Sequence, residues 1–332
     1  MAKRIIKITD ATLSCWTSAV GRHEGEGPLG NCFDFCDSSD SFGADTWEQS
    51  ENAMQKKAME LLLQKKGITV GDVGAVFAGD LQNQCVGSSY GLLDFDIPYF
   101  GLYGACSTAA ESIMLSAMSV SAGYFHRAVA VTSSHYLAAE RQYRSPIEYG
   151  SQRSPTAQWT VTGSGAFCID RDGCAAVTEA VPGVVVEKGI NDASNMGAAM
   201  APAAADTLLA YFSESGASPS DFDAIVTGDL GYEGGSILCE LLLSEGLDIR
   251  TQYNDCGMLI YDRERQDMHA GGSGCGCSAV VMAAHYLGRV ASGSIKKMLF
   301  LGTGAMMSPS SIQQGLAIPA VAHLVCIEHR GK

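Results

Sequence analysis

The chain has 332 residues, of which 46% are hydrophobic and 17% are charged, and its formal net charge at pH 7 is −14. A charged fraction below the usual quarter is typical of a compact body with a large interior. The acidic balance argues against nucleic acid and anionic lipid as partners, since both need a basic protein face.

The apolar stretch near the N-terminus is interrupted by Lys7, Thr9 and Asp10. No other window holds the roughly eighteen uninterrupted apolar residues that a membrane span needs. We therefore expect neither a secretion signal nor a transmembrane segment, and a soluble or peripheral protein in a cytosol-like compartment.

Twelve cysteines stand in the sequence. Because the chain is long and has no export signal, we expect most of them to be reduced thiols in the interior. The closest pairs are Cys32 with Cys36 and Cys275 with Cys277. Neither has a second pair at zinc-finger spacing, so we expect no metal ion. Nothing in the sequence points to a cofactor.

Along the chain, hydrophobic patterning predicts helices that alternate with short buried strands. In the first half we expect, in order, a helix, a strand, a helix and a strand over residues 46–66, 75–78, 108–125 and 128–132. In the second half we expect the same four elements over residues 201–215, 224–227, 271–287 and 298–302. The glycine-rich residues 25–30 follow no strand and lack the lysine of a phosphate-binding loop, so we interpret them as a plain loop.

The two halves of the sequence resemble each other. Residues 67–81 read GITVGDVGAVFAGDL and residues 216–230 read GASPSDFDAIVTGDL, with six of fifteen positions identical at an offset of 149. Residues 106–132 and 276–302 share the order of small-residue helix, glycine and strand at an offset of 170. Two matches in the same order indicate a duplication, and we expect one half over residues 1–172 and the other over residues 173–332.

The second expected helix of each half is unusually apolar. Residues 112–125 carry no charged side chain, and residues 271–287 have only His285 as a potential charge. A helix that is apolar all round is buried on all sides. One such helix in each half predicts a central helical layer between two sheets, with mostly parallel strand pairing. The fold class expected is α/β, with five layers α-β-α-β-α built from duplicated mixed-sheet halves.

The segment YGACSTAAES around Cys106 resembles the nucleophile segment of the thiolase superfamily, which includes thiolases and ketoacyl synthases. Residues 79–82, GDLQ, are similar to the strand end that precedes it. Residues 269–274, HAGGSG, resemble the His-Pro-x-Gly-x-Ser-Gly segment of the superfamily. The resemblance extends over nearly the whole chain, and it implies the same five-layer fold with a pocket centred on Cys106.

Four further motifs resemble one branch of this superfamily, the stage V sporulation protein AD family of spore-forming bacteria: GDLQNQC, QWTVTG, HAGGSGCGCS and GTGAMMSP. The resemblance implies that the chain binds pyridine-2,6-dicarboxylic acid (dipicolinic acid) for its uptake into the developing spore. It also implies an assembly with other stage V sporulation membrane proteins. The location implied is the cytoplasm or the periphery of the forespore or spore inner membrane.

Cys106 is the centre of the expected pocket. Thr108 and Glu111 have the spacing of a capping box, so a helix is expected to begin near Thr108. Cys106 then lies in the turn that enters the helix, where the helix dipole and free N–H groups stabilise a thiolate. The alternative is a buried cysteine without a role, but the surrounding segment favours a place in the pocket. Catalysis by Cys106 is a separate hypothesis.

The resemblance also places His269 opposite Cys106, as a base or hydrogen-bond donor; the alternative is a polar loop residue. At the position where the superfamily has a histidine or an asparagine, this chain has Asp229. A carboxylate beside a thiol raises the thiol pKa, which is the wrong direction for a nucleophile. Cys106 and His269 are therefore candidates for a vestigial catalytic pair. A structural role for Asp229 is equally open, because Asp80 occupies the matching position in the first half.

Residues 302–305 form a glycine-rich stretch near the C-terminus. The backbone N–H groups of Gly304 and Ala305, together with that of Cys106, are expected to form an oxyanion-type site. Such a site binds a carboxylate as readily as it stabilises a tetrahedral oxyanion.

A dianionic ligand also needs positive charge. Arg153 is the favoured cation, since arginine pairs with carboxylates through two hydrogen bonds. Arg141 and Arg144 are less favoured, and the alternative for all three is a solvated surface position. The expected ligand-binding set also includes two polar residues at the end of the preceding strand, Ser134 and His135, together with Asp229, Cys106, His269, Gly304 and Ala305.

Two functions compete at this point. The first is a binding protein whose catalytic groups have decayed, and the second is an acyltransferase of the ketoacyl synthase or thiolase type that uses Cys106. A purely structural subunit is a third reading. A homodimer is expected in each case, with the strand over residues 128–132 as the edge that pairs across a two-fold axis.

Overall fold

The computed structural model describes residues 3–143 and 153–331. In the first half the strands are β1 (Ile6–Lys7), β2 (Thr12–Val20), β3 (Phe35–Cys36), β4 (Ala75–Gly79), β5 (Tyr99–Leu102), β6 (Ala128–Ser134), β7 (Trp159–Thr160) and β8 (Gly163–Asp170). The helices are α1 (Arg22–Gly25), α2 (Trp47–Lys66), α3 (Val86–Gly91), α4 (Thr108–Ser121) and α5 (Tyr136–Tyr143).

In the second half the strands are β9 (Ala175–Val181), β10 (Ala224–Thr227), β11 (Tyr253–Asp255), β12 (Gly272–Ser273), β13 (Lys297–Ala305) and β14 (Ala320–His329). The helices are α6 (Met196–Ser215), α7 (Gly231–Ser244), α8 (Cys256–Leu259), α9 (Cys275–Val281), α10 (Leu287–Ala291) and α11 (Pro309–Gln313), with a π-helical turn over Met282–Tyr286 between α9 and α10. The helices and strands expected from the sequence are present, except that the helix expected over residues 271–287 begins only at Cys275, because Gly272–Ser273 form β12.

Two five-stranded arrangements with the same strand order form the body. One runs β5-β4-β6-β8-β2 and the other β11-β10-β13-β14-β9. If only these five strands of each half are numbered along the chain, both arrangements have the order third, second, fourth, fifth, first. The two arrangements meet where β2 and β9 pair over only two residues each. The repeat seen in the sequence is therefore a repeat of topology.

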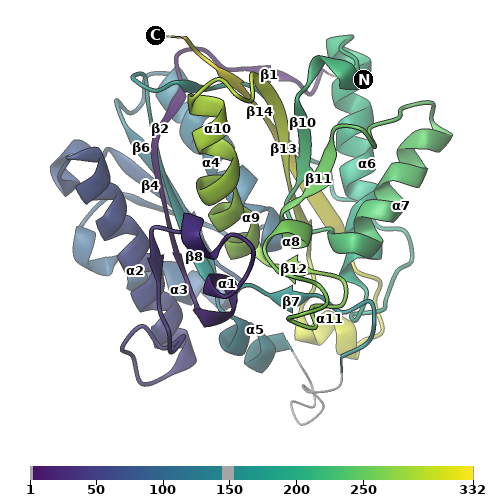
Figure 1. Ribbon diagram of the computed structural model, residues 1–332, viewed down its shortest axis with the longest axis horizontal. Helices are drawn as coiled ribbons and strands as arrows, with labels where there is room; N and C mark the ends of the chain where they lie inside the picture. Colours follow the sequence, from purple (N-terminus) through teal and green to yellow (C-terminus); the bar gives the residue numbers. More distant parts are fainter. Residues whose placement is uncertain (1–2, 144–152, 332) are drawn as a thin grey trace.

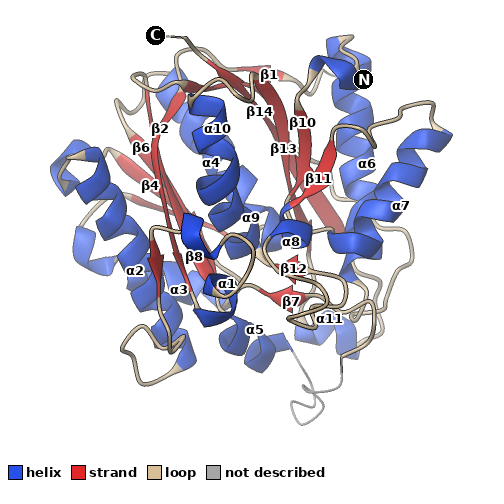
Figure 2. Cartoon of the chain, viewed as in Figure 1, coloured by secondary structure: helices blue, strands red, loops and turns tan. Residues whose placement is uncertain are grey.

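The layers are visible from the side in Figure 1. Helices α2 and α3 cover the outer face of the first sheet, α6 and α7 cover the outer face of the second, and α4, α9 and α10 lie between the sheets. Helix α4 contacts β4 and β6 on one side and β13 and β14 on the other. Figure 2 shows the same alternation of helix and strand layers. This is the expected α-β-α-β-α architecture, and it explains why α4 is apolar all round.

The strand pairing is mixed rather than mostly parallel. In the first half β4 pairs in parallel with β5 and β6, but β8 pairs antiparallel with β6 and β2. The second half repeats this division. The parallel pairs are the ones joined by buried crossover helices, whereas the last strand of each half returns antiparallel into the sheet. The expectation of mostly parallel sheets was wrong in this respect.

Local signals set several element boundaries. Helix α2 begins after Thr46, whose side chain accepts a hydrogen bond from the Gln49 N–H, and ends at Gly67 in the left-handed conformation. Helix α4 begins at Thr108, as expected, but the expected capping box is absent. Thr108 Oγ1 bonds to the backbone of Gly104 and Ala105 instead, and Glu111 Oε2 is buried without a hydrogen-bond partner.

Among the described residues, no helix is long and apolar enough to cross a membrane. All twelve cysteines are free thiols, and eight of them are buried in strands or helices of the interior or in the turns that enter them: Cys15, Cys85, Cys106, Cys168, Cys256, Cys275, Cys277 and Cys326.

The strand expected to form the dimer edge does not lie at an edge. Strand β6, which contains residues 128–132, pairs on one side with β4 and on the other with β8. The strand that ends the first sheet is β5, and it carries exposed aromatic side chains at Tyr99 and Phe100. An exposed apolar edge strand is a template for pairing with another chain. The dimer hypothesis therefore moves from β6 to β5.

We expect the chain to form a homodimer through β5, with a particle mass twice the 34.9 kDa of one protomer. Phe100→Asp places a charge on the edge and is expected to shift the equilibrium to monomer. Val185→Asp changes an exposed apolar side chain of the other half and is expected to leave the dimer intact. Sedimentation velocity distinguishes the outcomes, and a monomeric parent chain at micromolar concentration would count against the dimer.

A buried carboxyl group lies on the inner side of α2. Glu51 accepts hydrogen bonds from Gln82 Nε2 at 2.7 Å and from Ser133 Oγ at 2.9 Å. Burial, reinforced by the charge of Asp80, raises the pKa of Glu51 to about 8. Burial also raises the pKa of two other carboxyl groups to about 7, those of Glu24 and Asp255.

These pKa shifts predict a pH-dependent stability. In the unfolded chain the carboxyl groups ionise near about pH 4, so between about pH 4 and pH 8 the folded chain binds more protons than the unfolded chain. The free energy of unfolding is therefore expected to fall as the pH rises through this window. Glu51→Gln removes one group, and we expect the slope to decrease by up to about 1.4 kcal/mol per pH unit.

Denaturant titrations between about pH 5 and pH 8 measure this slope. Asp248→Asn is the matched control, because the pKa of Asp248 is lowered to about 2 by its bonds to Arg250 and this group does not titrate in the window. An unchanged slope in Glu51→Gln would contradict the assignment.

Candidate functional site

Cys106 lies in the turn between β5 and α4. Ala105, directly before it, has a left-handed backbone with φ of 51°, an uncommon conformation for a residue with a side chain. The turn is held by the Ser107 side chain, which donates to the Gly104 carbonyl at 2.6 Å. The thiol ends up at the start of α4, with Cys106 only 7% exposed.

A carboxylate and a hydroxyl from the second half lie behind the thiol. Cys106 Sγ is 4.0 Å from Ser273 Oγ, and Ser273 Oγ donates to Asp229 Oδ2 at 3.1 Å. Asp229 also accepts the Gly274 N–H at 2.8 Å and the Thr303 hydroxyl at 2.8 Å. Asp229 is thus fully buried and bonded to three donors. The aspartate that departs from the superfamily pattern stands at the thiol.

The electrostatics of this group oppose a thiolate. Burial is the main cause that raises the pKa of Cys106 well above its ordinary value, and the charge of Asp229 adds to it. Burial also raises the pKa of Asp229, while its hydrogen bonds act in the opposite direction. The expectation that the helix dipole stabilises a thiolate was wrong, because desolvation and a like charge outweigh it. Cys106 is a protonated thiol at neutral pH.

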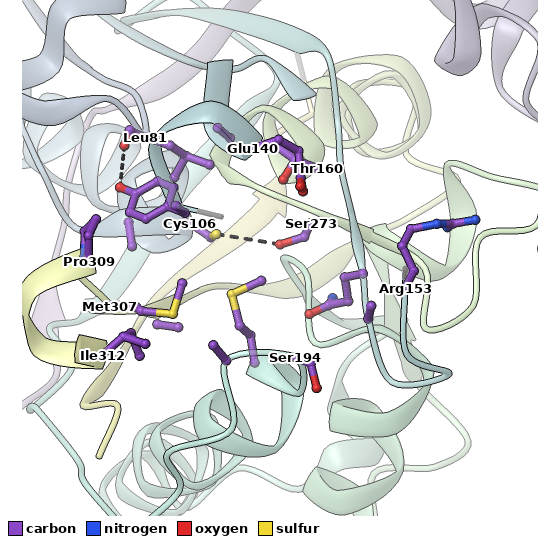
Figure 3. A pocket seen from close by; sticks show the side chains of 18 of the residues that line it. Leu81, Cys106, Glu140, Arg153, Thr160, Ser194, Ser273, Met307, Pro309 and Ile312 are labelled. Atoms are coloured by element: carbon purple, nitrogen blue, oxygen red, sulfur yellow. Dashed lines mark hydrogen bonds between the residues drawn. The ribbon is translucent and has the colours of Figure 1, made fainter. Parts of the chain in front are cut away.

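A cavity of about 360 Å³ opens beside Cys106. Its described walls come from the turn at residues 105–106, from α5, from residues 153–160 and 193–196, and from residues 305–313. Figure 3 shows Cys106 and Ser273 facing each other at one side, with Met307 and Ile312 across the space. The lining combines apolar side chains, chiefly alanine and methionine, with hydroxyl and amide groups and the charged side chains of Glu140 and Arg153.

Arg153 lines this cavity, but its guanidinium is bound elsewhere. It donates to the Asp267 carbonyl at 2.9 Å and to Asp267 Oδ2 at 2.8 Å, and it lies 5.1 Å from the centre of the Trp159 ring. In Figure 3 the Arg153 side chain extends away from Cys106. Arg141 contacts Glu48 on the surface, and Arg144 lies outside the described residues.

His269 does not face Cys106. Its Nδ1 is 2.7 Å from the Ser154 carbonyl and its Nε2 is 3.2 Å from Asp267 Oδ1, and it is not among the described residues that line the cavity. The polar residue that this loop brings to the thiol is Ser273, four positions later. The placement of His269 opposite Cys106 is therefore corrected, because the loop turns at His269, whose φ is 35°, before it enters β12.

Ser134 and His135 also lie away from the described cavity lining. The Ser134 hydroxyl donates to the Val161 carbonyl at 2.7 Å and accepts the Gly276 N–H at 3.2 Å, so it joins β6 to the start of α9. His135 Nε2 is 2.9 Å from the Asp40 carbonyl, and burial lowers the pKa of His135. Both side chains are occupied by structural contacts, which corrects their expected role as ligand-binding residues.

The glycine-rich stretch at residues 302–305 is the end of strand β13, not a loop, and it pairs with β14 as far as Ala305. Gly304 is required by a close approach: a Cβ there would lie 2.5 Å from the Gly104 carbonyl and 2.9 Å from the Ser107 nitrogen. Gly304 thus allows β13 to pack against the turn that carries Cys106. Ala305 lines the cavity, as expected for this stretch.

Ser273 is the functional residue that sequence reasoning missed. It occurs within the quoted motif, but the histidine four residues earlier was the stronger signal. A serine is one of the most ordinary residues in a glycine-rich turn, so only the folded loop could identify it. The contribution of α5 and α11 to the cavity wall was also not predicted, because nothing in the sequence distinguishes these short helices from others.

The fold and this site together define a thiolase-like protein. An OleA variant from Xanthomonas campestris superposes with a TM-score of 0.61 at 13% identity, over 97% of this chain and 99% of that chain. The 3-oxoacyl-(acyl carrier protein) synthase III of Xanthomonas oryzae gives a TM-score of 0.60 at 14% identity, over 96% of this chain and 100% of that one. At these identities the likeness establishes the fold.

Sequence comparison gives the family. The model of the family described as stage V sporulation protein AD matches residues 3–328. The stage V sporulation protein AD of Bacillus subtilis strain 168 is 41% identical over 315 residues, which cover 95% of this chain and 93% of that protein. The chain belongs to the stage V sporulation protein AD family, and its role is in a stage of sporulation.

The electrostatics of the thiol generate a prediction. Asp229→Asn removes the like charge beside Cys106, so we expect the thiol pKa to fall and alkylation of Cys106 by iodoacetamide to become about three- to tenfold faster at mildly alkaline pH. Mass spectrometry of the peptide that contains Cys106 measures the rate, and Cys106→Ser identifies the modified site. Slower labelling in Asp229→Asn would show that Asp229 activates the thiol instead.

Proposed function

We propose that this chain binds pyridine-2,6-dicarboxylate in the cavity beside Cys106 and serves its uptake into the developing spore, and that it does not condense acyl groups. The observation that carries the proposal is the buried Asp229 behind the thiol. Burial of the thiol, reinforced by this carboxylate, raises the pKa of Cys106 well above its ordinary value, and the cavity beside it stays open. A catalytic pocket has become a binding pocket.

Condensation needs a nucleophilic thiolate and a base or donor that stabilises charge in the transition state. Here the thiol pKa is raised, and the loop that enters β12 presents Ser273 rather than His269. None of the described residues that line the cavity is a histidine. Besides Glu140 and Arg153, the remaining polar groups of the lining are hydroxyls and amides, which bind and orient a ligand without exchanging protons near neutral pH.

The cavity suits a small aromatic diacid. A volume of about 360 Å³ is at the lower end of the range for ligand pockets, which run from about 300 to 1,000 Å³. The apolar walls from α5 and α11 offer contact for one flat ring. Ser194, Ser273 and Thr160 supply hydroxyl groups at the rim and the base. The identity of the diacid rests on the sequence resemblance to the sporulation family.

The cellular setting is part of the same proposal. A ligand-loading protein of a spore needs a route to membrane components, and we propose that other stage V sporulation membrane proteins are its partners at the forespore or spore inner membrane.

An acyltransferase is the second candidate. Cys106 stands at the start of α4 in a fold shared with a 3-oxoacyl-(acyl carrier protein) synthase, and its Sγ lines a largely apolar cavity. The protonated thiol argues against it. Stable acylation of Cys106 by an acyl-coenzyme A would favour this candidate over the binding function.

We predict one molecule of pyridine-2,6-dicarboxylate bound per protomer at neutral pH. The 3,5-isomer has the same charge and size, but both carboxylates are displaced, and charged hydrogen bonds are worth about 1.5–3 kcal/mol each. We therefore expect the 2,6-isomer to bind at least about tenfold more tightly. Titration calorimetry measures both affinities. Ligand-dependent protection of Cys106 from iodoacetamide locates the site, and equal affinities for the two isomers would argue against the proposal.

A further inference from the structure

Arg153 is the cation among the described residues that line the cavity. Its side chain is only 15% exposed, and its guanidinium makes both of its polar contacts with Asp267, one to the carbonyl and one to the carboxylate. Asp267 belongs to the loop of the second half that precedes β12. In this state the charge of Arg153 is directed away from the cavity and toward a carboxylate of the chain itself.

We propose that Asp267 is an intramolecular competitor for the ligand: its carboxylate occupies the guanidinium of Arg153, and a ligand carboxylate takes its place when the cavity fills. This inference rests on the proposed binding of a dicarboxylate. It assigns Arg153 as the cation of that site and Asp267 as the carboxylate that the ligand must displace. The exchange replaces one arginine–carboxylate pair by another, so no charge is left without a partner at Arg153.

The surroundings of the two carboxylates favour the exchange. The Asp267 side chain is 74% exposed, so water screens its ion pair with Arg153, and such pairs contribute little to stability. A ligand carboxylate in the cavity is largely removed from water and gains more from the same guanidinium. Once displaced, Asp267 is solvated and keeps His269 Nε2 as a neighbour at 3.2 Å.

The backbone of the loop at Asp267–His269 favours an ion pair between Asp267 and Arg153 that can be exchanged. Asp267 and His269 both have positive φ values, 55° and 35°, a conformation that costs free energy for residues with side chains. The Trp159 ring stacks against Tyr136 at 3.8 Å, and the Arg153 guanidinium lies 5.1 Å from the centre of the same ring. The Trp159 ring therefore holds the Arg153 guanidinium in place, while its ion-pair partner Asp267 can be replaced.

The opposite possibility is that Arg153 and Asp267 form a fixed clamp that shapes the cavity wall. In that case the pair holds residues 153–154 in place, together with the hydrogen bond from His269 to the Ser154 carbonyl. The two possibilities predict opposite changes in ligand affinity. Removing the charge of Asp267 tightens ligand binding if the carboxylate competes, and weakens binding if it clamps.

The test uses the full chain and titration calorimetry with pyridine-2,6-dicarboxylate. Asp267→Asn removes the charge, and asparagine tolerates the left-handed backbone. We expect about two- to fivefold tighter binding, the range that the loss of one exposed ion pair allows. Asp248→Asn is the matched control: it also removes an exposed aspartate that pairs with an arginine, Arg250 at 2.6 Å, and it is expected to leave the affinity unchanged.

Arg153→Gln is expected to weaken binding about tenfold or more, the loss of one charge-assisted carboxylate contact. In Arg153→Gln the further change Asp267→Asn is expected to have no effect, because the two act through one contact. Thermal unfolding verifies that each variant is folded. A gain in affinity that persists without Arg153 would overturn the mechanism.

The uncharged pyridine-2,6-dicarboxamide separates charge competition from a simple opening of the wall. It has the same shape but no carboxylate, so Asp267→Asn is expected not to tighten whatever binding it shows. An equal gain for the diamide, or weaker binding of the diacid to Asp267→Asn, would overturn the inference. If the parent chain binds no diacid at all, the proposed function itself fails, and that outcome is distinct from a parent that binds but does not respond to the Asp267 change.

Discussion

The buried carboxylate of Asp229 is the interaction on which this site depends. It follows β10, accepts the N–H of Gly274 at the entrance to α9 and the hydroxyl of Thr303 in β13, and so ties three elements of the second half together. Through Ser273 the same carboxylate reaches the thiol of Cys106 in the first half. Because burying a carboxylate is costly unless its lone pairs are bonded, these contacts fix the loop before α9, and with it the floor of the cavity.

The duplication shows what is special about this aspartate. Asp80 holds the matching position in the first half, where it binds the N–H and the hydroxyl of Ser88 and lies beside Glu51. Both aspartates are therefore structural ties at the end of the second strand of a half. The two halves differ because the first half supplies the turn with Cys106, so only the second-half aspartate lies against a thiol. Asp229 therefore keeps the structural role that Asp80 has in the first half, and in addition its charge acts on the Cys106 thiol.

The cavity combines apolar walls with very little free charge. Its described cation, Arg153, is paired with Asp267, and its thiol is protonated. Such a site binds a flat, largely apolar ring well, but an anionic group must find a partner before it enters. Under the proposed binding function, the Arg153 guanidinium would become available to a ligand carboxylate when its ion pair with the exposed Asp267 breaks.

The sequence by itself determined the architecture. The helices at α2, α4 and α6, the strands at β4, β6, β10 and β13, the duplication and the buried central helices all follow from periodicity and composition, because these signals are local or repeat within the chain. The position of Cys106 at the start of α4 and the departure at Asp229 were also readable, since both depend on residue type at a recognisable place.

Tertiary structure alone decided which side chains meet. The family resemblance favoured His269, but the turn at Asp267–His269, where both residues are left-handed, brings Ser273 to the thiol instead. Arg153 lines the cavity, yet its ion-pair partner Asp267 comes from a loop more than a hundred residues away. The edge strand was also misjudged, since only the pairing of β8 with β6 shows that β6 lies inside the sheet and that β5 forms its edge. Contacts between distant segments follow from packing, and no local pattern records them.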